Sequence, residues 1–457
     1  MNKYDADYED LRDFFNGERA VKKAGDRYTP RLEGQTKPGS YERYVEFGIL
    51  FNALARTRQG LKGAILRKPI DITFPESQKD ILDSIMKNGA SFNDMAREIT
   101  DAVLGYGRIG ALTDIDEHEE PYTALYDAPS ILEASKDGDE QRILLKEMIE
   151  EPDPEDPKKT KLVEQRRELK LENGLYVVTV LRKEAKGDGA TDGEFIPVES
   201  TPEKPNPMTP VYKGKYLDFI PFTFFGSSSN TPEPNKPPLL DLLNVLKGHW
   251  RLTVAYNYSL HFTALPTPCF AGFEKEPGES VALGPGSAHI ANDPTAKAYF
   301  MQTGGAGLES VERGLDRLET QISIIGARLL EGQRAGVEAA ETVKLRSAGD
   351  QATLADISGS IENGLTQVLQ HIGFWLGVPK ADCLVTTNKD FTSSRLSAPD
   401  IAVLLQSVNA GQISQDTFIE NLITGEIIKP GKTVEDEQQD ILEDKAKNDL
   451  TGGGAGF

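Results

Sequence analysis

The sequence is poor in cysteine and in long apolar runs. Its 457 residues include two cysteines, Cys269 and Cys383, which are too few for a disulfide framework or a cysteine-based zinc site. No apolar stretch reaches about 18 residues, so we expect neither a membrane span nor a membrane partner. The first ten residues hold four acids and no apolar run, so we expect no secretory signal. These absences favour a soluble protein in a reducing compartment.

Basic residues are also scarce. The chain has 51 Lys and Arg against 72 Asp and Glu, a formal net charge of −21. Because phosphate binding requires clustered Lys and Arg, this composition argues against a protein whose whole surface binds nucleic acid, and it leaves a local basic contact open. Hydrophobic residues make up 38% of the chain, which is enough for sizeable cores. The length corresponds to about three domains at roughly 150 residues each.

Motifs that would carry catalysis or bind a metal are missing. The sequence contains no H-E-x-x-H, C-x-x-C or G-x-S-x-G motif, and its five histidines lack metal-ligand spacing. The nearest approach to a phosphate-binding P-loop is Gly425 followed by Gly431, Lys432 and Thr433. Five residues instead of four separate its glycines, which breaks the ring of backbone N–H groups. We therefore expect no enzyme activity, no catalytic residue, no metal and no cofactor.

The N-terminal quarter of the chain predicts helices. Residues 17–38 are polar and interrupted by glycine and proline, and we expect a loosely held arm there. Ser91 with Asp94 three residues later resembles a capping box. The apolar spacing predicts helices over Tyr8–Asn16, Tyr41–Leu66, Ser77–Lys87 and Phe92–Gly105.

Between residues 108 and 226 the signals are those of strands and loops. Asn173-Gly174 is a strong hairpin turn. Six acids and three prolines in Glu147–Pro157 predict a solvated loop, and ten prolines between Pro197 and Pro238 predict an extended path over a surface. Strands are expected at Ile109–Leu112, Ile143–Ile149, Arg166–Leu171, Leu175–Arg182 and Phe219–Phe225.

The strongest periodicity follows residue 238. From Leu308 to Leu329, apolar residues recur at alternating spacings of 3 and 4, an a/d pattern over three heptads. Glu331–Gly336 interrupts this pattern. The elements expected in this part are the helix Leu239–Ala264, a small α/β piece at Cys269–Thr303 with strands Cys269–Phe273 and Ala298–Gln302, the heptad helix and the helix Val337–Leu376.

The C-terminal part predicts shorter elements. We expect a strand at Leu384–Thr387 and a pair of helices at Pro399–Ser407 and Ser414–Leu422. The tail Glu435–Phe457 is acidic and then rich in glycine, and it is expected to fray. Long helices combined with a β-rich middle predict an α+β fold. The heptad seam needs a partner helix, which can come from the same chain, from a second copy in a coiled-coil dimer, or from a neighbouring copy in a ring.

Several stretches resemble the portal (head–tail connector) proteins of tailed bacteriophages, in a group often catalogued only as a domain of unknown function. They span about residues 40–430. The stretches are Tyr44–Pro69, ending GLKGAILRKP; Pro237–Phe273, beginning PPLLDLLNVLKGHW; Gly336–Gly377, beginning GVEAAETVKLRSAGD; and, fitting the same pattern, Gly411–Ile428, GQISQDTFIENLITGEII.

The resemblance implies a portal-protein fold and a ring of twelve subunits at one capsid vertex. Double-stranded DNA would pass through this ring during packaging and ejection, without sequence specificity. The implied partners are further copies of the chain, the terminase large subunit, a head–tail adaptor, and the major capsid and scaffolding proteins. ATP hydrolysis would belong to the terminase. The implied location is the virion, after assembly in the host cytoplasm.

Carried onto this chain, the resemblance also implies a division into parts. These are an N-terminal arm (1–40), a wing (41–238), a first stem helix (239–268), a clip (269–304), a second stem helix (305–330), a tunnel loop (331–336), a long wing helix with a returning strand (337–398), and a crown with the C-terminal tail (399–457).

The resemblance implies two sets of site residues. In the tunnel loop, Arg334 is the main candidate for contact with DNA, and a solvated residue or an intersubunit ion pair are the alternatives for it. The DNA-facing loop is Gly332, Gln333, Arg334, Ala335 and Gly336, with weaker basic candidates in Arg328, Lys344 and Arg346. The clip residues expected to meet the motor or adaptor are Phe273, Glu274, Lys275, Glu276, Pro285 and His289.

The charge of the chain fits a conduit on physical grounds. An acidic tunnel repels the phosphate backbone, so DNA slides through without being gripped. The alternative function is a coiled-coil oligomeric scaffold or adaptor that takes no part in DNA passage. Electron microscopy of the purified protein separates the two, because a portal forms rings with a central hole and a coiled coil forms dimers or rods.

Overall fold

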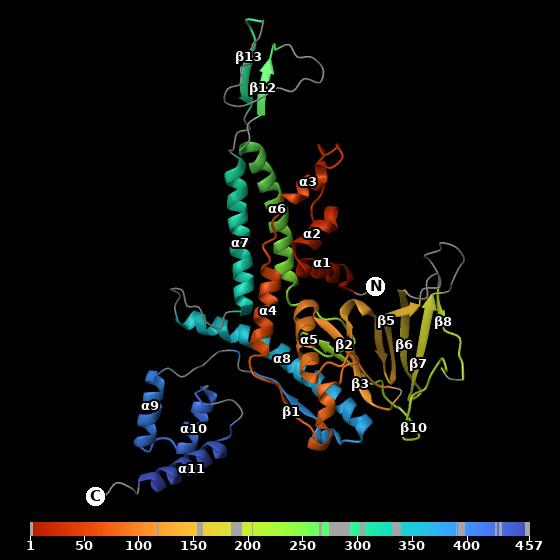
Figure 1. The fold of residues 1–457 in the computed structure, drawn as a ribbon, viewed down its shortest axis with the longest axis vertical. Coiled ribbons are helices and arrows are strands. Elements are labelled where there is room, and N and C mark those ends of the chain that lie inside the picture. Colours follow the sequence, from red (N-terminus) through yellow and green to blue (C-terminus); the bar gives the residue numbers. More distant parts are fainter. Residues whose placement is uncertain are drawn as a thin grey trace. The chain divides into compact units, whose positions relative to one another are not determined.

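The structure is a computed structural model. The chain divides into two compact units, Met1–Lys389 and Asp390–Phe457. The first unit combines helices with antiparallel sheets, and the second is helical (Figure 1). This agrees with the predicted α+β class. The structure describes residues 3–116, 118–152, 159–183, 194–202, 204–264, 267–273, 293–301, 307–330, 340–389, 391, 398–425, 427–428 and 432–452.

Five helices open the first unit, and two predictions for them are confirmed. The predicted first helix is present, and Ser91 and Asp94 form the predicted capping box, in which Ser91 Oγ accepts the Asp94 N–H at 3.1 Å. The helices are α1 (Asp5–Asn16), α2 (Glu18–Ala24), α3 (Ser40–Glu46), α4 (Ala53–Ile65) and α5 (Phe92–Tyr106).

Two helix predictions are wrong in this part. The helix expected over residues 41–66 is broken into α3 and α4, because the backbone at Gly48 runs against Trp250: a Cβ on Gly48 would lie 2.2 Å from the indole ring. Asn52 then starts α4 by accepting the Ala55 N–H. The helix expected over residues 77–87 is a 3₁₀ helix, Glu76–Asp83, and the following chain pairs with strand β3 (Pro121–Asp127) instead of continuing it.

The predicted loose arm is packed in its first part, up to Thr29, whereas residues 30–38 are mostly exposed. Tyr28 and Thr29 are buried, and both contact the helix α6 (Leu240–Ala264). Trp250 Nε1 donates to Thr29 Oγ1 at 2.9 Å, and Arg251 Nε donates to the Tyr28 carbonyl at 3.1 Å. These contacts join residues more than 200 positions apart, so the local polar composition of the arm could not reveal them.

Two antiparallel sheets follow, in the strand orders β11-β2-β3 and β4-β5-β6-β7-β8. The predicted Asn173-Gly174 turn joins β6 and β7, with φ of 52° and 74°. Strands β3, β4 and β8 were not predicted. The strands other than β3 are β2 (Arg108–Ile115), β4 (Ile131–Asp137), β5 (Glu140–Pro152), β6 (Thr160–Glu172), β7 (Leu175–Lys183), β8 (Phe195–Pro197) and β11 (Phe222–Gly226).

The prediction of a solvated loop at 147–157 is wrong for its first half. Strand β5 continues to Pro152 and pairs with β6 along its length. Glu147 lies on the face of β5 that also carries Ile143 and Leu145, and it meets Arg167 of β6 at 2.8 Å. The high count of acids suggested a solvated loop, whereas this segment is a strand in which Arg167 on the next strand neutralises the carboxylate of Glu147.

The core of the first unit lies between the two sheets and helix α8 (Ala340–Leu376). The predicted helix is present, apolar side chains spaced three and four residues apart form a buried seam along it, and it ends at Gly377 in the left-handed region, with φ of 77°. The buried seam residues are Ile357, Ile361, Leu365, Val368, Ile372 and Trp375. Two short pairs complete the unit: β1 (Asp71–Thr73) with the predicted β14 (Leu384–Thr386), and β9 (Val211–Tyr212) with β10 (Lys215–Tyr216).

Two glycines of α8 test this packing. A Cβ on Gly364 would lie 2.4 Å from the ring of Phe225 on β11, whereas a Cβ on Gly359 meets nothing within 4 Å. We expect Gly364→Ala to lower the unfolding free energy by about 1–3 kcal/mol through overpacking. The matched Gly359→Ala should raise it by about 0.5–1 kcal/mol through helix propensity. Urea unfolding measures both, and a Gly364→Ala variant as stable as the parent contradicts the packing of α8 on β11.

The second unit contains the predicted helix pair and one further helix. The pair is α9 (Ala398–Asn409) and α10 (Gln415–Thr424). Most of the tail that was expected to fray forms α11 (Val434–Gly452), and residues 453–457 lie outside the described residues. Thr433 caps this helix by accepting the Asp436 N–H at 3.1 Å, and acids in the first turn suit the positive end of the helix dipole.

Candidate functional site: the α6–α7 helix pair and its strand hairpin

Helix α6 and helix α7 (Leu308–Leu330) lie side by side along most of their length (Figure 1). A Cβ on Gly248 would lie 4.0 Å from Leu318, and one on Gly314 would lie 3.0 Å from Leu252. Higher residue numbers on α6 contact lower residue numbers on α7, so the two helices are antiparallel. His249 Nε2 also lies 3.3 Å from Glu319 Oε1 across the pair. Small residues on each helix allow the leucines of the other to approach closely.

The heptad seam of α7 therefore has its partner within the chain. Leu318 of the seam faces α6, and Ile322 is 2% exposed. Of the three partners open from the sequence, the intrachain helix is the one present. A coiled-coil dimer through the same seam would have to displace α6.

The N-terminal arm secures α6 through a polar cluster. The Tyr28 hydroxyl donates to carboxylates of Asp10 and Asp13, at 3.0 and 2.9 Å. Burial raises the pKa of Tyr28, and the two carboxylates raise it further. Lys247 of α6 pairs with Asp10. This cluster fixes the base of the helix pair to the first helices of the chain.

A strand hairpin joins α6 to α7. Strands β12 (Thr267–Ala271) and β13 (Lys297–Met301) pair antiparallel, which confirms both strands predicted there. Because β12 starts directly after α6 ends, the hairpin lies at that end of the helix pair. Tyr299 is 56% exposed and Phe300 is 68% exposed. The hairpin thus exposes two aromatic side chains.

Few of the predicted clip residues fall within the structure. Phe273 lies just after β12, and its ring packs edge-on against Phe270 with centroids 5.3 Å apart. Phe270, Tyr299 and Phe300 were missed by the sequence reasoning, although aromatics in a short strand hairpin are a visible signal. Glu274, Lys275, Glu276, Pro285 and His289 lie outside the described residues.

The predicted DNA-facing residues are not brought together by the described structure. The tunnel loop Gly332, Gln333, Arg334, Ala335 and Gly336 lies outside the described residues. Arg328 belongs to α7, and Lys344 and Arg346 belong to α8, but the description does not extend to these three side chains. All three roles stay predictions.

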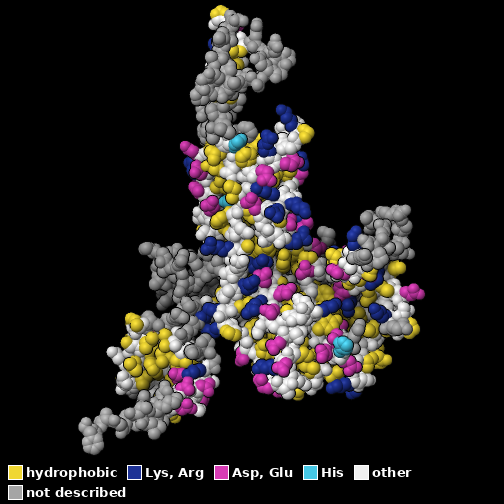
Figure 2. Space-filling view, viewed as in Figure 1, with side chains coloured by type: hydrophobic (Ala, Val, Ile, Leu, Met, Phe, Trp, Pro, Cys, Tyr) yellow, Lys and Arg dark blue, Asp and Glu magenta, His cyan; other side chains and the backbone are white. Residues whose placement is uncertain are grey.

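The exposed charges of α7 form a feature that the sequence reasoning missed. Four acids and two arginines of this helix are exposed, and in Figure 2 acidic side chains follow the edge of the pair that α7 forms. The signal was present in the heptad spacing, which had been read for its apolar positions alone. The acids are Glu309, Glu312, Asp316 and Glu319, and the arginines are Arg313 and Arg317.

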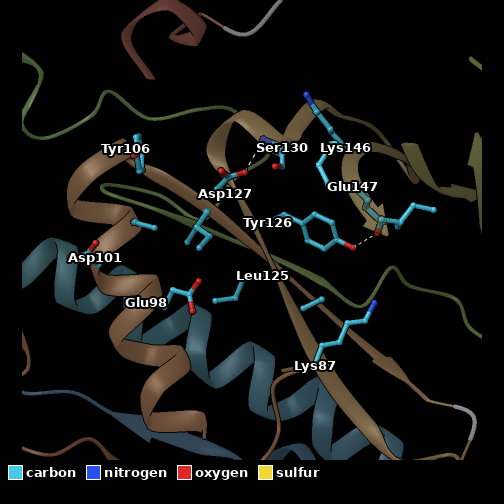
Figure 3. A pocket seen from close by; sticks show the side chains of 15 residues that line it. Lys87, Glu98, Asp101, Tyr106, Leu125, Tyr126, Asp127, Ser130, Lys146 and Glu147 are labelled. Atoms are coloured by element: carbon cyan, nitrogen blue, oxygen red, sulfur yellow. Dashed lines mark hydrogen bonds between the residues drawn. The ribbon is translucent and has the colours of Figure 1, made fainter. Parts of the chain in front are cut away.

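A separate cavity of about 590 Å³ lies between α5, β3 and β5 (Figure 3). The Tyr126 hydroxyl donates to Glu147 at 2.6 Å, Asp127 accepts the Ser130 N–H at 3.1 Å, and Asp101 pairs with Lys62 at 3.0 Å. Most polar groups of this cavity are therefore engaged in contacts that hold the sheets and helices together. Burial, and then the charge of Asp101, raise the pKa of Glu98 at its rim.

Lys432 of the near-miss P-loop is engaged in the second unit. Its ammonium pairs with Glu437 at 2.9 Å and with Asp440, both on α11. Across the residues that the structure describes, no three His, Cys, Asp or Glu side chains are grouped so as to hold a metal ion. No helix among them is both long and apolar enough to cross a membrane.

Comparisons with known proteins bear on the same region. The family described as "Domain of unknown function (DUF4055)" matches residues 238–376, which contain α6, the hairpin, α7 and α8. No curated protein matches the chain.

Solved structures also show a weak similarity. One is the neck of an empty GTA particle computed with C6 symmetry (TM-score 0.39, 12% identity, covering 89% of this chain and 97% of that chain). A second is the neck of a native GTA particle computed with C12 symmetry (TM-score 0.38, 12% identity, 89% and 98%). A third is the virion of a native gene transfer agent (GTA) particle (TM-score 0.37, 12% identity, 89% and 98%). TM-scores this low do not establish a common fold.

Proposed function

We propose that the chain is a portal subunit: copies form a ring at one capsid vertex, and double-stranded DNA passes through the ring during packaging and ejection. The observation that carries the proposal is the order of elements after residue 239. The order is a long helix (α6), a strand hairpin, a second long helix antiparallel to the first (α7) and a third long helix (α8). The resemblance gives the same order to the first stem helix, the clip, the second stem helix and the wing helix.

The exposed surface of the helix pair supports this role. The hairpin at its end carries exposed Tyr299 and Phe300, and aromatic residues are enriched where proteins meet partners. In this proposal the hairpin docks the terminase motor and later the head–tail adaptor. The first unit otherwise supplies the wing, and the second unit supplies the crown.

The net charge supports passage without binding. At −21 per copy, a ring repels the phosphate backbone, and few counterion-releasing contacts would hold the duplex. In this proposal the chain acts as a structural conduit and leaves ATP hydrolysis to the terminase. The proposed setting is a particle neck in the virion, with twelve copies in the ring.

Negative-stain electron microscopy of the purified protein tests the proposal. We expect rings with a central hole at least as wide as a DNA duplex, about 20 Å or two helix diameters, and class averages with twelve-fold symmetry. Sizing by mass photometry at the same concentration should give a matching mass. Particles that remain single chains, pairs or rods, even when scaffolding and capsid proteins are added, contradict the proposal and favour the scaffold alternative.

A further inference from the structure

The exposed charges of α7 are sorted by sign. Glu309, Glu312, Asp316 and Glu319 follow spacings of 3, 4 and 3, so they line up on one side of the helix; we call them the acidic stripe. Arg313 and Arg317 are four residues apart and form an arginine stripe. The acidic stripe and the arginine stripe are both exposed.

Heptad positions place the two stripes relative to the seam. With Leu308 at position a, the acids occupy e and b, which adjoin each other on one side of the seam. The arginines occupy f, at the outer crest of the helix, and c, on the side of that crest opposite the acids. Because the seam packs on α6, neither stripe is covered by it. The helix thus offers an acidic side and a basic side to its surroundings.

Within the part of the chain that the structure describes, most of these charges have no partner of opposite sign. No ion pair joins Arg313 or Arg317 to any acid among the described residues, and the one polar contact of Arg313 is from Nε to the Glu309 carbonyl at 3.3 Å. On the acidic side, Glu319 approaches His249. Acidic and basic side chains that lie on separate sides of a helix, with few ion pairs among the described residues, are expected where this surface binds a surface of complementary charge on another molecule.

The arrangement bears on how a partner copy can dock. In a two-fold dimer the same patch meets itself, so an axis that passes through either stripe would place like charges against each other, and only an axis between the stripes would pair them. In a ring the contacts are heterologous, and one side of each α7 faces the opposite side of the next. The acidic stripe of one copy then faces the arginine stripe of its neighbour.

We propose that the acidic and arginine stripes of α7 form the contact between neighbouring copies of this chain, with Arg313 and Arg317 of one subunit pairing with the acids of the next. This inference rests on the proposed ring and names the surface that sets its handed, head-to-tail order. Complementary charges at such a contact fix register and exclude wrong arrangements.

Charge reversal tests the contact. Arg313→Glu/Arg317→Glu makes both sides of α7 acidic, and Glu312→Arg/Asp316→Arg leaves the acidic stripe without net charge, because Glu309 and Glu319 remain. We expect each variant alone to need at least about tenfold more protein for half-assembly of rings, measured by mass photometry, because the attraction between the stripes is reversed in the first variant and lost in the second. An equimolar mixture should assemble better than either variant alone, since the intact acidic stripe of one variant can face the intact arginine stripe of the other in a ring of even number.

Two controls separate the possible failures. Lys79→Glu/Arg97→Glu changes the net charge equally at exposed positions on other elements, and it should leave assembly unchanged. Circular dichroism and melting temperature should match the parent for every variant, since the changed side chains are exposed. Rings that form normally from the Arg313→Glu/Arg317→Glu variant would overturn the proposed contact and leave the portal proposal standing. Failure of the unmodified protein to form rings would overturn the portal proposal itself.

Discussion

Replacing Arg167 by methionine is expected to lower the unfolding free energy by about 3–5 kcal/mol, because it leaves a buried carboxylate without its counter-ion. The Arg167 and Glu147 side chains are only 19% and 13% exposed, and Arg167 Nε donates to Glu147 Oε1 at 2.8 Å. Tyr126 and Gln165 donate to the same carboxylate. Arg167 is thus the cation that pairs with this buried carboxylate.

The state of Glu147 explains the size of this effect. Burial raises the pKa of Glu147, but the charge of Arg167 and the hydrogen bonds from Tyr126, Gln165 and Arg167 outweigh it and hold the pKa below its usual value. Without the guanidinium, only the burial and the neutral donors remain. The carboxyl must then stay charged at high cost or take up a proton, and either outcome weakens the native state at neutral pH.

Urea unfolding of a double-mutant cycle measures the coupling. Glu147→Gln removes the charge and keeps the shape, so Glu147→Gln/Arg167→Met should lose less stability than the sum of the single changes. Arg97→Met, at an exposed i, i+3 pair on α5, is the matched control and should change stability by less than about 1 kcal/mol. Additive effects at positions 147 and 167 would contradict a buried, coupled pair.

Long amphipathic elements could be read from the sequence because their signal is repeated. The seam of α8 gives six buried side chains at spacings of three and four, and the heptads of α7 likewise extend over the whole helix. The order of α6, the hairpin, α7 and α8 followed from such patterns together with proline and glycine boundaries. Each repeat adds to the same conclusion, so one atypical residue does not alter it.

Features that depend on distant residues could not be predicted. The break at Gly48 and the burial of Tyr28 both arise from α6, where Trp250 and Arg251 meet segments over 200 positions earlier. Glu147 was read with its acidic neighbours as part of a solvated loop, because the cation that neutralises it lies on another strand, twenty positions on. Local composition indicates whether a segment is exposed to solvent, but it does not indicate which strand is its neighbour in the sheet.

The candidate site likewise has one part that local sequence predicts and one part that it does not. The helix pair and its hairpin were predicted, since they depend on local periodicity. The role proposed for the outer face of α7 was not predicted, because it depends on a second molecule. The heptad letters nevertheless contained the information: once a and d are assigned, the signs of the residues at b, c, e and f can be read directly.

Acidification is expected to destabilise the first unit through His371 on α8. This imidazole is buried, stacks on Phe219 with centroids 5.5 Å apart, and lies 3.5 Å from Thr223 Oγ1 on β11. Burial, and then the charge of Lys380, lower its pKa from 6.5 to about 4. The unfolded chain therefore binds a proton at this site before the folded chain does, and stability falls as the pH drops from 6.5 to 4.

The expected loss from this one group is about 2 kcal/mol at pH 5 and about 3 kcal/mol at pH 4, relative to pH 7.5. Urea unfolding at several pH values measures it, and His371→Gln removes the titrating group. Between pH 7.5 and pH 5 or 4, the unfolding free energy of the parent should fall by these amounts more than that of the variant. This comparison separates the effect of His371 from that of carboxylates that titrate in the same range. His118→Gln, at an exposed histidine, should leave the pH profile of the parent unchanged. A His371→Gln profile parallel to that of the parent between pH 6.5 and 4 would mean that the imidazole is reached by water, and that α8 is not sealed against β11 as the packing of Gly364 on Phe225 requires.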